Sequence, residues 1–230
     1  VRGGMEDISP RDPAAPNIDG RECGNGLVID HGDGWETQYC HMRKGSLRKA
    51  KGDAVATGEA LGLIGLSGNT EFPHLHLSLR KNGQEIDPFD PDGAAGCGPG
   101  PEAALWADPI AYASGGLLQI GLSDSVPAWE AIKQGLDMPP PSQRAPALVV
   151  WVHYFGSRAG DRLTLSITAP DGTTVVADGI TLEKTQAQGF RAIGRKARQA
   201  AWSQGRYHLE AVLTRDGAEV DRVTDEVGLR

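Results

Sequence analysis

"EFPHLHLSLR", residues 71–80, alternates polar and apolar side chains and carries two histidines one residue apart. Every second side chain of a β-strand lies on the same face, so the alternation predicts a strand with His74 and His76 on one face. Leu75 and Leu77 then lie on the opposite face, and we expect them to be buried beneath the histidines. Two imidazoles on one strand face indicate either a metal-assisted active site or a polar pair on an exposed sheet.

Turn residues divide the neighbouring sequence into hairpins. The stretches GNGLVIDH (24–31) and WETQYCHM (35–42) are separated by Gly-Asp-Gly, which is a strong hairpin signal. Asn82-Gly83 follows the histidine strand and predicts a second hairpin with QEIDPF (84–89). ALGLIGLSG (60–68) is predicted to be a further, glycine-rich strand. The first part of the chain is therefore predicted to be an antiparallel β domain.

A change in composition marks a domain boundary. PDGAAGCGPGP (91–101) is rich in glycine, proline and alanine, which is typical of a linker. The predicted organisation is a first domain over residues 1–92, a linker over residues 93–116 and a second domain over residues 117–230. A short helical connector is expected within the linker, at residues 105–113.

The second domain is predicted to be an immunoglobulin-like β-sandwich, which makes the whole chain all-β. Alternating strands recur around Asp171-Gly172 and Asp216-Gly217, a spacing typical of small antiparallel sandwiches. We expect no metal in this domain, and we interpret His153 and His208 as ordinary strand residues. The residues predicted to be largely buried are Val150, Val152, Leu163, Leu165 and Ile167.

The overall charge and hydrophobicity exclude two classes of partner. The net charge of −7 argues against a nucleic-acid partner, which would require a basic face. No window approaches eighteen apolar residues, so no membrane span is expected. No signal peptide is recognisable after Val1, although one could have been removed. The basic stretch formed by Arg191, Arg195, Lys196 and Arg198 is typical of a solvated loop or an edge strand.

The three cysteines allow at most one internal disulfide. Cys23 and Cys40 flank the strands of the first hairpin, so a bridge between them is conceivable, but Cys97 leaves all three pairings open. The absence of a CxxC pair weakens any interpretation as a cysteine-ligated structural zinc site.

Four motifs follow one another in the first domain. They are Gly24 to Gly32 (GNGLVIDHG), Tyr39 to Met42 (YCHM), Gly62 to Leu77 (ending PHLHL) and Asp87-Pro88. This series resembles the lysostaphin-type (LytM-domain) zinc metallopeptidases. The resemblance covers roughly residues 1–92 and is far more specific than the histidine pair alone. It implies a LytM-like antiparallel β domain.

The resemblance also implies roles for three histidines and a Zn²⁺ cofactor. His76 would bind the zinc, while His74 and His41 would activate or position the water and stabilise the tetrahedral intermediate. A zinc ion polarises a carbonyl and lowers the pKa of its bound water toward ~7. Imidazoles are suited to proton transfer near neutral pH.

One part of the family pattern is missing from this sequence. The related enzymes take two further ligands from an H-x-x-x-D motif that precedes the first hairpin, and no histidine precedes Gly24 here. Either the chain begins inside the domain, which we expect, or the domain is degenerate. We therefore expect the chain as it stands to bind zinc weakly or not at all and to be inactive. If another residue has taken over the role of zinc ligand, the candidates are Asp7, Asp12 and Asp19.

The resemblance implies a zinc-dependent endopeptidase that cleaves the peptide cross-links of bacterial peptidoglycan. The expected partners are peptidoglycan peptide stems, and the expected location is periplasmic or secreted. The alternative is a non-catalytic LytM-like module that binds the cell wall or activates a cell-wall amidase.

Overall fold

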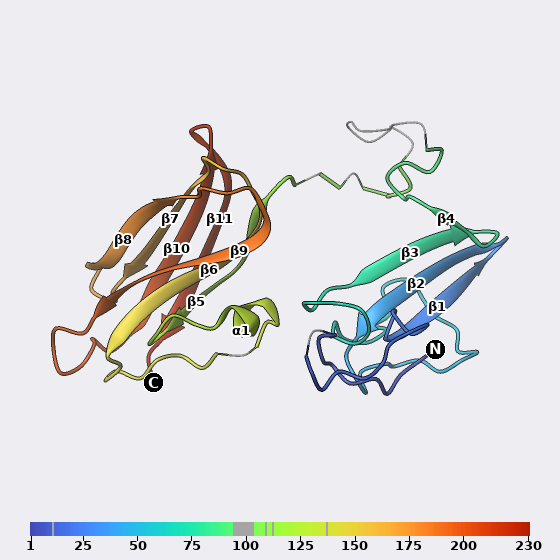
Figure 1. The fold of residues 1–230 in the computed structure, drawn as a ribbon, viewed down its shortest axis with the longest axis horizontal. Coiled ribbons are helices and arrows are strands. Elements are labelled where there is room, and N and C mark those ends of the chain that lie inside the picture. The colour runs from blue at the N-terminus through green and yellow to red at the C-terminus, as the bar shows by residue number, and fades with distance from the viewer. Residues whose placement is uncertain (11, 94–103, 109, 112, 137) are drawn as a thin grey trace. The chain divides into compact units, whose positions relative to one another are not determined.

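The chain divides into two units, Val1–Ala111 (unit 1) and Tyr112–Arg230 (unit 2). The computed structural model describes residues 1–10, 12–93, 104–108, 110–111, 113–136 and 138–230. Nearly all of its regular structure is antiparallel β-sheet, so the all-β prediction is confirmed (Figure 1). Most of the predicted glycine- and proline-rich linker, including Cys97, lies outside the described residues. The helix expected at 105–113 is not formed at residues 105–108, where Asp108 precedes a proline that disfavours the helical conformation.

Unit 1 contains one four-stranded antiparallel sheet in the order β1-β2-β3-β4. Both predicted hairpins are present, and each turns on two residues with positive φ. These are Asp33 (φ 51°) with Gly34 (φ 78°), and Asn82 (φ 51°) with Gly83 (φ 78°). Two such residues make the tight turn whose twist matches that of the flanking strands. The strands are β1 (Asn25–Gly32), β2 (Trp35–Met42), β3 (His76–Lys81) and β4 (Gln84–Ile86).

The strand predicted at residues 60–68 is wrong. This segment makes only isolated bridges, from Ile64 to Met42 and from Gly65 to His74. Its backbone crosses close to a neighbouring segment, because a Cβ on Gly65 would lie 2.4 Å from the backbone of Arg43. The glycines therefore serve a close backbone crossing and not a strand.

The predicted burial of Leu75 and Leu77 is also wrong. Their exposed fractions are 46% and 36%. β3 begins only at His76, so Leu75 precedes the strand, and Leu77 pairs with Tyr39, which is itself only partly buried. Alternation along a strand predicts which side chains share a face, but it does not say what covers that face.

Unit 2 is a sandwich of two antiparallel sheets whose inner faces share one core (Figure 1). All five core residues predicted from the sequence are completely buried, which confirms that prediction. The immunoglobulin-like assignment stays a prediction. The first sheet contains β5 (Gly116–Ser123), β6 (Ala147–Ser157) and β9 (Gln186–Lys196). The second contains β7 (Arg162–Thr168), β8 (Thr174–Thr181), β10 (Arg206–Arg215) and β11 (Ala218–Gly228).

Helix α1 (Trp129–Lys133) was not predicted, because five residues are too few to show helical periodicity. No helix in the described part of the chain has the length and apolarity needed to cross a membrane.

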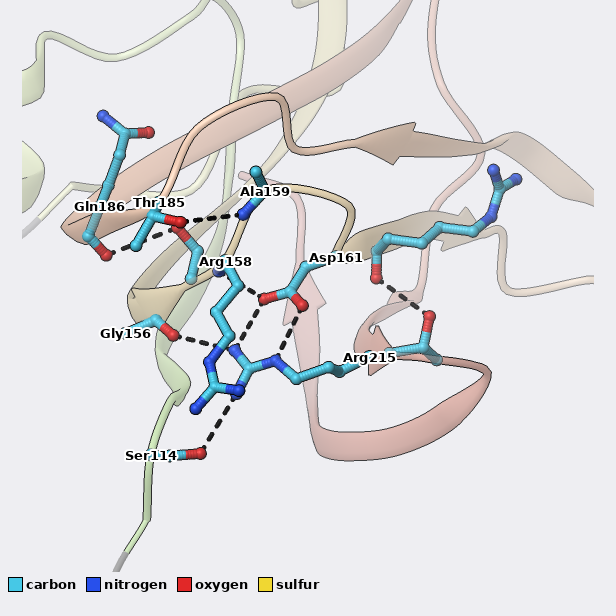
Figure 2. Close-up of polar contacts among 11 residues, drawn as sticks. Ser114, Gly156, Arg158, Ala159, Asp161, Thr185, Gln186 and Arg215 are labelled. Carbon is cyan, nitrogen blue, oxygen red and sulfur yellow. Dashed lines mark hydrogen bonds and ion pairs between the residues drawn. The ribbon is translucent and has the colours of Figure 1, made fainter.

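A bidentate ion pair ties the end of β10 to the turn before β7 (Figure 2). Arg215 donates from Nε to Oδ1 of Asp161 (2.9 Å) and from Nη2 to Oδ2 (2.8 Å). The same guanidinium donates to the carbonyl of Gly156 and to the hydroxyl of Ser114. Asp161 is 1% exposed, and its bonds to Arg215 hold its pKa below the usual range. This pair joins the loops at one end of the sandwich.

Candidate active site

Three histidines of unit 1 lie together, as the sequence predicts. The ring centroid of His41 is 4.8 Å from that of His74 and 5.7 Å from that of His76. His41 lies near the end of β2, and His76 opens β3 directly opposite Cys40. His74 precedes β3 and is held by the bridge to Gly65. The pairing of β2 with β3 therefore brings the YCHM motif to the histidine pair.

The backbone and the ring of His41 are each held by a carbonyl group. Its φ is 60°, a value uncommon for a residue other than glycine, and its amide donates to the carbonyl of Cys23 (2.8 Å). Its ring Nδ1 donates to the carbonyl of Ser67 (2.8 Å). Burial lowers the pKa of His41 below its usual value, against the opposing effect of the Ser67 carbonyl. The ring is therefore neutral near pH 7, with Nε2 as its unprotonated nitrogen.

The loop that contains Ser67 supports this histidine. The buried Ser67 hydroxyl donates to the carbonyl of Met42 (2.7 Å) and accepts from the amide of Asn25 (2.9 Å). A Cβ on Gly24 would lie 2.4 Å from the Ser67 backbone, so glycine is needed there for the close approach. Ser67 and its contacts were not predicted to be functional, although Ser67 lies inside the Gly62 to Leu77 motif.

His74 is oriented in a similar way by its own loop. Its Nδ1 donates to the carbonyl of Phe72 (2.9 Å) and lies 3.0 Å from the hydroxyl of Thr70. That hydroxyl itself donates to the Phe72 carbonyl (2.8 Å). In the neutral tautomer that this bond selects, Nδ1 of His74 carries the proton and Nε2 is left as an acceptor. Thr70 is a second residue of this motif whose role the sequence did not predict.

His76 is exposed and lies beside a disulfide. Its strand partner Cys40 is bonded to Cys23, which is one of the three pairings that the sequence leaves open. The backbone carbonyl of Cys23 also accepts a hydrogen bond from the amide of His41. The bridge therefore joins the segment before β1 to β2, the strand that carries His41 and pairs with β3.

The described residues do not supply a complete metal site. None of them form a group of three or more histidine, cysteine, aspartate or glutamate side chains that could hold a metal ion. Asp7 accepts the amides of Lys44 (2.8 Å) and Leu66 (2.9 Å), so its carboxylate is used in the fold. Asp12 and Asp19 likewise accept local hydrogen bonds. A catalytic zinc site takes three protein ligands and a water, so the residues present do not fit this ion by themselves.

The remaining histidines lie elsewhere. His31 bonds to the Thr37 hydroxyl (2.7 Å) at the turn end of the first hairpin. In unit 2, His153 is buried beside Gln188, and His208 lies 3.0 Å from a carboxylate oxygen of Glu226.

Comparison with known families assigns this part of the chain. Residues 15–88 match the sequence model of Peptidase family M23. They form a Peptidase family M23 domain. This confirms the resemblance inferred from the four motifs, while the roles of His41, His74 and His76 stay predictions.

Curated relatives match between about a quarter and two fifths of this chain. The chain is 40% identical over 65 residues to the DD-carboxypeptidase/endopeptidase Mpg of Neisseria meningitidis serogroup B (strain ATCC 13091 / M2091), covering 28% of this chain and 14% of that protein. It is 38% identical over 64 residues to the peptidoglycan DD-endopeptidase ShyA of Vibrio cholerae serotype O1, again covering 28% and 14%. The matches thus span about one seventh of the length of these relatives. The match to a solved structure of a Bifidobacterium dentium β-glucuronidase covers 51% of this chain and 18% of the β-glucuronidase chain, at 21% sequence identity. Its TM-score of 0.30 is too low to inform the fold.

Proposed function

We propose that this chain is part of an endopeptidase that cleaves peptide cross-links of bacterial peptidoglycan in the periplasm or outside the cell. The M23 domain and the printed activities of its relatives support this proposal. The observation that carries it is the pair His41 and His74, whose ring centroids are 4.8 Å apart. In both rings a carbonyl holds Nδ1 and leaves Nε2 for chemistry.

Two imidazoles held in this way are suited to peptide hydrolysis. One can accept a proton from the attacking water, and the other, once protonated, can donate a hydrogen bond to the developing oxyanion or a proton to the leaving amine. Burial lowers the pKa of His41, which favours the neutral ring that a base requires. We assign proton transfer and positioning of the water to His41 and His74. The proposed substrate is the peptide stems of the cell wall.

We assign His76 as a ligand of the Zn²⁺ ion that the family uses. The described residues form no group of three ligands for this ion. The same observation favours a second candidate function. In that case the M23 domain would bind cell wall without cleaving it, or would activate a separate cell-wall amidase.

Zinc analysis combined with a wall-degradation assay tests the proposal. The 230-residue chain and the complete gene product are dialysed, their zinc is measured, and each is incubated with purified peptidoglycan. We expect the 230-residue chain to hold less than one zinc per molecule and not to cleave peptidoglycan. We expect the complete gene product to hold zinc and to cleave peptidoglycan. In the latter, His76→Ala should lose the metal, while His74→Ala should keep it and lower kcat.

His31→Ala is the matched control, because it removes an imidazole of the same unit that lies outside the cluster. It should leave zinc content and cleavage unchanged. Stoichiometric zinc with cleavage by the 230-residue chain alone would show that another residue, such as Asp7, Asp12 or Asp19, completes the site. A complete gene product that binds the wall but neither holds zinc nor cleaves would decide for the non-catalytic module.

A further inference from the structure

A hollow of about 270 Å³ opens at one end of the unit 2 sandwich. Its wall combines the start of β8, the end of β9, the loop that follows β9, and β10. The residues that carry its chemistry are Asp171, Arg195, Lys196, Arg198, Trp202 and Tyr207.

Three cations and one carboxylate line this hollow. Arg195 donates from Nη1 to the carbonyl of Val175 (2.8 Å), which leaves its other N–H groups available. Lys196, the last residue of β9, and Arg198, in the loop that follows, are exposed. The Asp171 carboxylate already accepts the amide and the hydroxyl of Thr173, at 2.9 and 2.7 Å. The hollow therefore carries an excess of positive charge, in a chain whose net charge is −7.

Three other arginines of unit 2 form ion pairs. Arg215 pairs with Asp161, Arg222 with Glu210 and Glu219, and Arg206 with Glu226. Among the described residues, no ion pair involves any of the three cations of the hollow. Three cations outside these ion pairs therefore lie close together where the surface is concave.

The aromatic residues of the hollow are fixed by the fold. Trp202 is partly buried, and its Nε1 donates to the carbonyl of Ala145 (2.9 Å). Tyr207 is 1% exposed, and its hydroxyl donates to the carbonyl of Ser203 (2.9 Å). Rings that are already held in place lose little conformational freedom when a ligand binds.

We propose that this hollow binds a carboxylate of a short peptide, and specifically of a peptidoglycan peptide stem. Arginine and lysine make strong charge-assisted hydrogen bonds to carboxylates. The volume lies just below the ~300–1,000 Å³ typical of small-molecule sites, which suits one residue of a peptide better than a larger group. The identity of the peptide rests on the proposed function, because wall hydrolysis is what places unit 2 next to peptide stems. Unit 2 would then hold the wall while the M23 domain acts on it.

Titration calorimetry on the 230-residue chain tests the site. The probes are a synthetic stem tetrapeptide with free carboxylates, the same peptide with its carboxylates amidated, and inorganic phosphate. We expect the free peptide to bind at least about tenfold more tightly than either of the others, since ~1.4 kcal/mol of lost ion pairing corresponds to a factor of ten. Lys196→Gln and Arg198→Gln should each weaken binding of the free peptide several-fold.

Lys184→Gln is the matched control, because it removes one exposed positive charge from unit 2 outside the hollow. It should leave the affinity unchanged. Equal binding of the amidated peptide or of phosphate would overturn the assignment, as would an equal loss of affinity in Lys184→Gln. Binding is measured as heat in a chain that is not expected to cleave, so its outcome is separate from that of the wall-degradation assay. If the peptide binds but the complete gene product does not cleave peptidoglycan, the binding site is upheld and the proposed endopeptidase activity is overturned. If the complete gene product cleaves but the peptide does not bind, the activity is upheld and the binding site is overturned.

Discussion

The two units are stabilised by different kinds of interaction. In unit 2 the core side chains come from both sheets, and many, such as Leu165 and Leu209, are fully buried. In the described part of unit 1 few apolar residues are buried, and Ile64 is 52% exposed. Its sheet is tied instead by the Cys23–Cys40 bridge, by close glycine contacts and by the buried Ser67 hydroxyl.

The histidine cluster therefore lies where order depends on a few specific links. Removing one link in unit 1 should change the geometry of His41, whereas the sandwich spreads its stability over many contacts. Unit 2 also contains a specific link of this kind, the buried ion pair between Arg215 and Asp161. The following four substitutions test this contrast, in decreasing order of expected effect.

Arg215→Met should give the largest loss of stability, because it leaves the buried carboxylate of Asp161 without the guanidinium of Arg215. Removing one member of a buried pair costs about 3–5 kcal/mol of unfolding free energy. Hydrogen exchange of the β10 amides measures the effect within unit 2. Arg222→Met is the control, since its ion pairs are exposed and such pairs contribute ~1 kcal/mol or less. Equal losses in the two variants would contradict a special role for the buried pair.

Cys23→Ser should destabilise unit 1 by about 3 kcal/mol, the value expected for a bridge that closes a loop of this length. It should also speed exchange of the His41 amide, because that amide donates to the carbonyl of Cys23. Cys97→Ser removes the cysteine outside the bridge and should have no such effect. Unchanged exchange at His41 in Cys23→Ser would mean that the bridge does not hold the histidine.

Ser67→Ala should destabilise unit 1 by about 1–3 kcal/mol, because it leaves the buried amide of Asn25 without its acceptor and removes one of two donors to the Met42 carbonyl. Chemical denaturation measures the loss, and the ring signals of His41 in NMR report any change in its orientation. Ser78→Ala, on β3 of the same sheet, is the control and should cost much less. A similar loss in both variants would show that the Ser67 hydroxyl has no special part in the site.

The smallest effect is a pH dependence in unit 2. Burial lowers the pKa of His153 below its usual 6.5, so the unfolded chain takes up this proton at a higher pH than the folded chain. The contribution of His153 to stability is therefore complete above pH 6.5 and is lost as the pH falls toward its folded-state pKa. His153→Gln should flatten the thermal stability of unit 2 between pH 7 and pH 5. His31→Gln, in unit 1, should leave that pH profile unchanged, and a profile that is equally steep in His153→Gln would contradict the assignment.

Local signals predicted the hairpins and the sandwich strands well. Asp-Gly and Asn-Gly pairs allow the positive φ values of tight turns, and these residues are adjacent in the chain, so no distant contact is needed to recognise them. The strand predicted at 60–68 was wrong because its glycines serve a backbone crossing with Arg43, a residue that no local pattern connects to them. Helix α1 is too short to leave a periodic signal.

The sequence by itself determined the all-β class, the turns, the core residues of the sandwich and the identity of the three histidines, because each depends on local spacing or on a specific motif. Only the tertiary structure decided how those histidines are oriented. The carbonyls of Ser67 and Phe72 choose which ring nitrogen of His41 and His74 carries the proton, and pairing of β2 with β3 sets the distances between the rings. The tertiary structure also decided that Leu77 stays partly exposed and that unpaired cations of β9 meet Trp202 in one hollow. Side-chain burial and charge pairing depend on what packs against a strand, and that information lies in residues far away along the chain.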